Sequence, residues 1–319
     1  MKITTRKLSL GWISGSVLFA CLAIGALPYL DFLGAGWIPK LQAFQPMLLA
    51  FPVLALIIGV LRRRWIACGF VVVFLLCGLL PNLNLATTAI QKDSADFDLS
   101  VLAFNALKAG SDPEQLAELI SVADPQILVL VETSEPLHQQ LATRGALDHL
   151  GYRSLEAPAG GERDTVIFSK YPLYERTTEL DTKTTGWYSL PVVDVKSPDG
   201  IFTVAGIHIY PPVGDAQRWR NGLQAVDGWT GGQRHYPLVL AGDFNSVRAH
   251  PGFRALMNDG FSEADGVWPA STWPADRKFN AMIGLDHIMS RGASVTEFSV
   301  HAVDGSDHLA VSATVEFDH

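Results

Sequence analysis

Hydrophobic residues follow two different patterns along this chain. Up to residue 83 they form three runs without a charged residue, at 8–30, 44–61 and 65–83. An α-helix rises about 1.5 Å per residue, so roughly 20 apolar residues cross the hydrocarbon core of a bilayer. From residue 97 onward the apolar runs are short and end at polar side chains. The pattern predicts three transmembrane helices in residues 1–83, followed by a globular domain.

Basic residues beside these runs indicate how the anchor is oriented. Residues 62–64 are all arginine and separate the second run from the third. Each arginine would cost about 2.5 kcal/mol or more at the bilayer centre, so we expect a loop there. Three basic residues also precede the first run, whereas the loop after it contains only Lys40. The positive-inside rule therefore places the amino terminus in the cytoplasm and residues 84–319 outside it, in a multi-pass protein of the cell (inner) membrane.

Other interpretations of this amino-terminal part remain open. Residues 8–30 could be a cleaved signal peptide, although the run exceeds the usual length and two further runs follow it. Residues 18–21 faintly resemble a lipoprotein cleavage site, in which Phe19 fits poorly. The runs could also be buried helices of a soluble core, or a transporter. No charged residue lies inside a run, so anchoring is the simpler role.

Charge and cysteine content divide the chain at about residue 90. Of the 24 basic and 32 acidic residues, seven basic and one acidic residue lie in residues 1–90, which gives a charge of +6. The remaining 17 basic and 31 acidic residues give residues 91–319 a charge of −14. All three cysteines lie in the first part, so a disulfide scaffold is excluded for the second. The second part also lacks the net basic character that drives strong non-specific binding to duplex nucleic acid.

The second part alternates strand and helix signals. Short runs rich in β-branched residues predict strands at residues 98–105, 127–131, 165–168, 190–195, 201–208, 238–245, 285–289 and 309–315. Helices are expected at about 111–123, where Asp112 and Pro113 form a helix start, and at about 215–229. About nine strands with interspersed helices predict a single α/β domain at 97–319, preceded by a linker at 84–96.

Several of these runs end at, or directly follow, a polar side chain. The residues concerned are Asn105, Glu132, His208, Asp243, Asn245, Asp307 and His308. Ligands in layered α/β domains collect where strand ends open into loops. Asp243 and Asn245 are two residues apart on a predicted extended segment, so we expect both side chains on one face. Each residue alone is more often a turn former, and only the joint pattern indicates a site.

The same residues lie in short motifs whose order is characteristic. These motifs are Phe104-Asn105, Val131-Glu132, Gly206-Ile207-His208, Ala241-Gly242-Asp243-Phe244-Asn245, Leu285-Asp286-His287-Ile288 and Ser306-Asp307-His308. From about Asp98 to the end, some 70% of the chain, the sequence resembles the endonuclease/exonuclease/phosphatase superfamily. The preceding apolar runs are similar to those of a bacterial membrane-anchored subgroup. The resemblance implies a four-layer α/β sandwich, in which two packed β-sheets are flanked by helices.

The resemblance also implies a chemistry, the metal-assisted in-line hydrolysis of a phosphate ester. It assigns Glu132 as the principal ligand of Mg²⁺ or Mn²⁺, with Asn105 and Asp307 close to the metal. Hard divalent cations prefer oxygen ligands, and Mg²⁺ keeps several waters, so one or two carboxylates suffice.

Catalytic roles follow from the resemblance in the same way. Asp243 is expected to deprotonate or align the attacking water, helped by Asn245. His308, oriented by Asp286, is expected to donate a hydrogen bond to a non-bridging phosphate oxygen. His208 is expected to contact the phosphate from the other side, and its carboxylate partner is not identifiable from the motifs.

Two further residues are predicted to bind substrate. Arg163 precedes the strand at 165–168, and Tyr210 follows His208. Trp273 is another candidate for the pocket wall, and ordinary packing is the alternative for both aromatic residues. Leu107 lies two residues after Asn105, where abasic-site enzymes of the superfamily carry an acid, which counts against that class.

The sequence therefore predicts a membrane-anchored, divalent-metal-dependent phosphodiesterase of lipid or nucleic-acid type that acts outside the cytoplasm. Its expected partners are a phosphate-ester substrate and the lipid bilayer, and no obligate protein partner can be inferred. The alternative is a catalytically silent envelope protein that uses the same domain for binding. A protein without catalytic activity would be expected to have lost at least one motif residue by mutation, and all of them are present.

Overall fold

The computed structural model describes residues 4–84, 97–154, 164–176, 179–264, 266–275 and 280–317. The chain forms two compact units. The first comprises Met1–Leu83 with Arg248–Pro251, and the second comprises Asn84–Val247 with Gly252–His319. Of the predicted linker, only Asn84 lies within the described residues.

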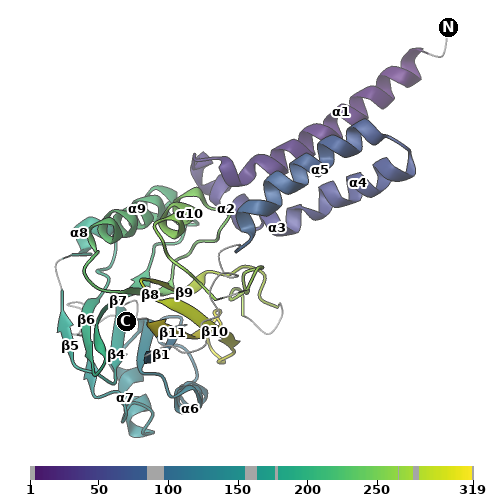
Figure 1. The fold of residues 1–319 in the computed structure, drawn as a ribbon. Helices are drawn as coiled ribbons and strands as arrows, with labels where there is room; N and C mark the ends of the chain where they lie inside the picture. Colours follow the sequence, from purple (N-terminus) through teal and green to yellow (C-terminus); the bar gives the residue numbers. More distant parts are fainter. Residues whose placement is uncertain are drawn as a thin grey trace. The chain divides into compact units, whose positions relative to one another are not determined.

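The first unit is helical. Its elements are α1 (Thr4–Ala26), α2 (Trp37–Ala43), α3 (Gln45–Leu48), α4 (Ala50–Leu61) and α5 (Trp65–Leu79), with 3₁₀ turns η1 (Leu27–Tyr29), η2 (Gly34–Gly36) and η3 (Leu80–Asn82). Helices α1, α4 and α5 run side by side (Figure 1). A Cβ atom on Gly25 of α1 would overlap the carbonyl oxygen of Phe74 in α5, and one on Gly78 would lie 3.2 Å from the Cα of Gly25. Glycine at these two positions lets the helix backbones approach closely.

One helix among the described residues is long and apolar enough by itself to cross a membrane, Trp65–Asn82. Gly15–Tyr29 and Gly34–Ala43 meet the same test only as a pair that bends by 108° at the break between them, and Gln45–Leu61 is shorter. The three spans predicted at 8–30, 44–61 and 65–83 are therefore not all supported by helix length. Helix α2, which the hydrophobic pattern did not predict, follows the glycine-containing η2 turn.

The second unit contains two β-sheets. The first sheet has the strand order β10-β11-β1-β2-β4-β3 and the second has the order β5-β6-β7-β8-β9. The strands are β1 (Phe97–Asn105), β2 (Ile127–Thr133), β3 (Tyr152–Arg153), β4 (Asp164–Ser169), β5 (Leu173–Glu175), β6 (Val192–Ser197), β7 (Gly200–His208), β8 (Leu238–Asp243), β9 (Asp286–Arg291), β10 (Ser294–His301) and β11 (Ala310–Phe317). The helices are α6 (Pro113–Ala123), α7 (Glu135–Thr143), α8 (Thr182–Thr185), α9 (Ala216–Gly232) and α10 (Pro251–Asn258).

Strand β1 shows why the central strands are apolar along their whole length. Leu99 and Val101 pack into a core shared with Val204 and Val239 of the second sheet. The alternate residues of β1, such as Leu102, pack into a separate core with α6 and α7, which cover the outer face of the first sheet (Figure 1). Side chains alternate between the two faces of a strand, so a strand that is buried on both faces has apolar residues at consecutive positions of its sequence. The predicted α/β sandwich of two packed sheets is thus the observed fold.

Sequence and structure agree best at the centre of each sheet. Every predicted strand run overlaps an observed strand, and the two predicted helices correspond to α6 and α9. The strands that were not predicted, β3, β5 and β10, each lie at the edge of a sheet. Edge strands are half exposed and short or interrupted, so they lack a continuous apolar run.

Strand pairing brings several polar strand ends together. β1 and β2 are parallel, and Asn105 is the register partner of Val131. β7 and β8 are also parallel, with His208 opposite Asp243. β9 runs antiparallel to β8 and starts at Asp286, directly opposite Asp243. The carboxyl ends of β7 and β8 therefore meet the amino end of β9 at one edge of the second sheet.

Candidate active site

Asp243, the last residue of β8, is buried, and its carboxylate is held from three directions. Its Oδ2 accepts hydrogen bonds from Nδ2 of Asn105 at 3.1 Å and from Nδ2 of Asn245 at 3.0 Å. Its Oδ1 accepts the backbone N–H of Asn245 at 2.8 Å. Asn105 ends a strand of the first sheet, so this network joins the two sheets at the site. Three donors fix the orientation of the carboxylate.

Asn245 reaches this carboxylate by a different geometry from the one that the sequence suggested. Strand β8 ends at Asp243, and Asn245 has a left-handed backbone with φ of 47°. The two side chains meet, as expected, but the predicted reason, alternation along an extended segment, is wrong. A tight turn folds the amide back onto Asp243 instead, a conformation that asparagine tolerates better than most residues.

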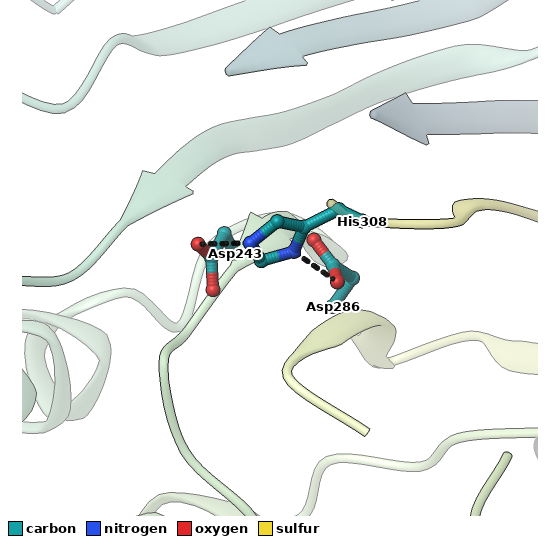
Figure 2. Close-up of side chains that lie close together, drawn as sticks. All are labelled: Asp243, Asp286 and His308. Atoms are coloured by element: carbon teal, nitrogen blue, oxygen red, sulfur yellow. Dashed lines mark hydrogen bonds and ion pairs between the residues drawn. The ribbon is translucent and has the colours of Figure 1, made fainter. Parts of the chain in front are cut away.

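His308 lies between two buried carboxylates, as Figure 2 shows. Its Nδ1 lies 2.8 Å from Oδ2 of Asp286, and its Nε2 lies 3.8 Å from Oδ2 of Asp243. The Nε2 atom is also 3.9 Å from Oδ1 of Asp307. The structure thus places Asp286 directly behind His308, where the motifs suggested it.

The electrostatics of this group follow from its burial. Burial disfavours the charged form of His308, but the carboxylates of Asp286 and Asp243 outweigh it and raise the pKa of His308 to about 10. Burial, together with the nearby Asp286, raises the pKa of Asp243 to about 7, although the charge of His308 opposes this shift. At neutral pH, His308 is therefore an imidazolium and Asp243 is poised to accept a proton.

Glu132 and His208 form a second pair. Oε1 of Glu132 lies 3.5 Å from Nε2 of His208, which is buried, and Oε2 accepts the backbone N–H of Lys108 at 3.0 Å. The motifs left the carboxylate partner of His208 open, and Glu132 lies within ion-pair distance of His208. Glu132 itself has a left-handed φ of 51°. A non-glycine residue in this region is strained, and such strain is concentrated at functional sites.

Asp307 presents one of its carboxylate oxygens without a hydrogen bond. Its Oδ2 accepts the indole N–H of Trp273 at 3.0 Å, whereas its buried Oδ1 accepts no hydrogen bond from a described residue. The neighbouring Ser306 donates its hydroxyl to the backbone oxygen of Asn105 at 2.7 Å, which ties this loop to β1. A buried carboxylate oxygen without a donor is suited to a cation.

These observations test whether a divalent cation fits the site. Glu132, Asn105 and Asp307 offer only oxygen atoms, the donors that Mg²⁺ and Mn²⁺ prefer. A different group, Asp243, Asp286 and His308, has candidate ligand atoms within 4.8 Å of one another. A protonated imidazole has no free lone pair for a metal, so this second group is less suited to a cation while His308 is an imidazolium. By the chemistry of their ligand atoms, the oxygens of Glu132, Asn105 and Asp307 therefore suit a hard divalent cation better.

Of the two predicted substrate-binding residues, Arg163 lies outside the described residues. Tyr210 is part of an aromatic cluster beside His208. The ring of Trp187 lies 4.4 Å from that of His208 and 4.9 Å from that of Tyr210, and Tyr188 stacks on His208 at 6.5 Å. Trp187 and Tyr188 could not be predicted as site residues, because they follow the short helix α8 in a loop that belongs to no motif. Their adjacent aromatic side chains were the only local signal.

Comparison with known proteins confirms the family resemblance. Residues 102–308 match the model of the Endonuclease/Exonuclease/phosphatase family. A search of curated proteins finds no match. Among solved structures, the chain is similar to D. rerio TDP2 complexed with a single strand DNA product, with 15% identity, a TM-score of 0.57 and coverage of 69% of this chain and 100% of that chain.

Two further structures show the same fold. A humanized D. rerio TDP2 has 17% identity and a TM-score of 0.55, with coverage of 69% of this chain and 99% of that chain. Sphingomyelinase C from Streptomyces griseocarneus has 16% identity and a TM-score of 0.51, with coverage of 68% and 99%. At such identities the likeness concerns the fold of the second unit, and the chemistry must be argued from the site.

Proposed function

The chain belongs to the endonuclease/exonuclease/phosphatase family, and we propose that it is a membrane-anchored, divalent-metal-dependent phosphodiesterase acting outside the cytoplasm. The observation that carries this proposal is the hydrogen-bonded network around Asp243, in which Asn105, Asn245 and the nearby His308 meet from different strands and loops. A binding protein without turnover has no need for a carboxylate with a near-neutral pKa beside an imidazolium.

In the proposed mechanism, Asp243 aligns the attacking water and accepts its proton. The amides of Asn105 and Asn245 fix the carboxylate, so little reorganisation is needed when the water is deprotonated. The raised pKa of Asp243, about 7, suits a general base at neutral pH.

His308 is proposed to stabilise the negative charge that develops on the phosphate. With Nδ1 occupied by Asp286, its Nε2 is the atom left to donate to a non-bridging oxygen. His208, beside Glu132, is proposed to contact the phosphate from the other side. A divalent cation held by Glu132, Asn105 and Asp307 would supply further positive charge to the phosphate oxygens.

Membrane anchoring is proposed from the first unit. Its apolar helices and the three arginines between α4 and α5 support an orientation with the amino terminus in the cytoplasm. Fusing a reporter to the carboxyl terminus tests this directly. An alkaline phosphatase fusion should be active and a green fluorescent protein fusion dark, and the opposite pattern would overturn the orientation.

The substrate is proposed to be a small or membrane-borne phosphodiester, such as a phospholipid headgroup. One similar structure is a TDP2 complexed with a single strand DNA product, and another is a sphingomyelinase. The fold alone therefore does not decide between nucleic-acid and lipid substrates. The net charge of −14 on residues 91–319 disfavours long nucleic acid, whose binding is dominated by phosphate contacts.

Activity of the full-length protein in a nonionic detergent tests the function. We expect Mg²⁺- or Mn²⁺-dependent hydrolysis of bis(p-nitrophenyl) phosphate and of phospholipids in preference to single-stranded DNA or RNA. EDTA and Asp243→Asn should abolish it, whereas Asp199→Asn, at an exposed position in the β6–β7 turn, should not. Binding without any turnover would favour the silent envelope protein, and full activity of Asp243→Asn would refute the assigned base.

A further inference from the structure

The turn between α4 and α5 carries an arginine at a backbone position that favours glycine. The N–H of Arg63 donates to the carbonyl of Val60 at 2.9 Å, and the N–H of Arg64 donates to that of Gly59 at 2.8 Å. This pair of bonds is the Schellman arrangement that ends many helices, and Arg63 holds its left-handed position with φ of 53°. A side chain strains the backbone there. The strain suggests that the Arg63 side chain has a role beyond forming the turn.

A cavity of about 490 Å³ lies beside this turn, within the first unit. Arg63 and Arg64 form its charged part, and its apolar part includes Leu18 of α1 together with Trp65, Ile66 and Phe70 of α5. Helices α1 and α5 pack against each other along this side of the unit (Figure 1). The cavity is therefore amphipathic, with two guanidinium groups beside an apolar wall.

Among the residues whose side chains the structure describes, none pairs with the charged groups of the cavity, and its apolar wall is largely exposed. Trp65, Ile66 and Phe70 are 64%, 82% and 53% exposed. Arg63 and Arg64 are exposed, and neither forms an ion pair with another residue in the described ranges. The one acidic residue among the first 90 is Asp31. An occupant of this cavity must therefore bring both negative charge and hydrocarbon.

We propose that the cavity binds an anionic phospholipid, with its phosphate on Arg63 and Arg64 and an acyl chain along Ile66 and Phe70. Guanidinium groups recognise phosphate through paired hydrogen bonds. Tryptophan is enriched at the level of lipid headgroups, which suits Trp65 beside the charged end. The positive end of the α5 dipole adds to the attraction for an anion. This lipid site shares no residue with the proposed active site.

Lipid binding by the full-length protein tests the proposal. Thermal unfolding in a nonionic detergent is followed while didecanoyl phosphatidylglycerol or didecanoyl phosphatidylcholine is titrated, with EDTA present so that no metal-dependent hydrolysis consumes the lipid. We expect phosphatidylglycerol to raise the unfolding temperature at concentrations at which phosphatidylcholine does not. Soluble sn-glycerol 3-phosphate should have no effect, because it lacks the hydrocarbon part.

The Arg63→Gly variant distinguishes an effect on lipid binding from an effect on the stability of the turn. Glycine relieves the left-handed backbone, so this variant should be at least as stable as the wild type without lipid. Its affinity for phosphatidylglycerol should fall about fivefold, the effect of one basic residue near an anionic lipid. Arg62→Gln, which neutralises the adjacent arginine outside the cavity, should bind like the wild type.

Four results would each overturn the proposal. These are equal stabilisation by the two lipids, wild-type lipid affinity in Arg63→Gly, an equal loss in Arg62→Gln, and stabilisation by sn-glycerol 3-phosphate alone. Equal loss in Arg62→Gln would mean that the loop attracts lipid only by its total charge.

Discussion

Oδ2 of Asp286 lies 2.8 Å from Nδ1 of His308, and both side chains are buried. The two residues come from separate parts of the chain, the start of β9 and the loop before β11. Because this contact occupies Nδ1, it leaves Nε2 directed toward Asp243 (Figure 2). The pair thus fixes both the charge and the direction of the proposed phosphate donor.

Replacing Asp286 with asparagine tests this relationship. The change keeps the size of the side chain but removes the negative charge that favours the imidazolium form of His308. We expect kcat to fall about a hundredfold, in the range typical of a lost acid–base group, with a smaller change in KM. An Asp199→Asn variant controls for loss of a carboxylate elsewhere, and an unchanged kcat in Asp286→Asn would show that His308 acts without this partner.

The pH dependence of activity follows from Asp243 and His308. Asp243 must be ionised to accept a proton, so kcat/KM should rise with pH through about 7. His308 must stay protonated to donate, so activity should fall again as the pH rises through about 10. In Asp286→Asn the alkaline limb should move to lower pH, because His308 loses a charge that raises its pKa. Rate profiles of the two proteins at saturating Mg²⁺ provide the comparison, and an unmoved alkaline limb would contradict the assignment of His308.

Trp273 offers a test of the proposed metal site that does not depend on activity. Its indole N–H holds Oδ2 of Asp307, which leaves Oδ1 free of hydrogen bonds from described residues. Trp273→Phe keeps the ring but removes this donor, and the dissociation constant for Mn²⁺ should rise about tenfold, as expected for loss of a group that orients a ligand. Paramagnetic resonance of free Mn²⁺ measures it. Trp229→Phe is the matched control, since Trp229 also donates to a carboxylate, that of Glu179.

The central strands and the set of motif residues could be predicted from the sequence. Central strands such as β1 and β8 were predictable because burial on both faces makes them apolar throughout. The motif residues Asn105, Asp243 and His308 were predictable as a set, and the structure brings them together.

What the sequence did not predict depends on contacts between distant residues. The approach of Glu132 to His208 joins β2 of one sheet to β7 of the other. Trp187 lies against His208 from a loop without a motif. The position of Asn245 depends on a left-handed turn that period-two alternation cannot reveal. Such features arise from tertiary packing and backbone conformation, which local residue patterns do not encode.

The buried His138 is expected to make the free energy of unfolding depend on pH. The residue is buried, its Nε2 lies 2.8 Å from Oγ1 of Thr133, and burial lowers its pKa to about 4. In the unfolded chain the pKa is about 6.5, so below that pH the unfolded state binds the extra proton. Stability should therefore decline as the pH falls from about 6.5 to 4, by about 2 kcal/mol at pH 5. Denaturant unfolding of wild type and His138→Gln at pH 7.5 and 5 measures the difference, and parallel losses in both proteins would exclude His138 as the cause.

Trp187 is predicted to be a positioning residue for His208. Its ring lies 4.4 Å from the imidazole and also contacts Tyr188 at 4.7 Å, so it limits the orientations that His208 can adopt. Trp187→Leu removes this aromatic wall, and we expect kcat/KM to fall about tenfold, because a small displacement of a catalytic group is costly. Trp187→Phe retains an aromatic face and should recover most of the activity. A general packing defect would lower the unfolding temperature together with the activity in Trp187→Leu. A positioning role instead requires the leucine variant to stay folded at the assay temperature and to regain activity only with the aromatic replacement.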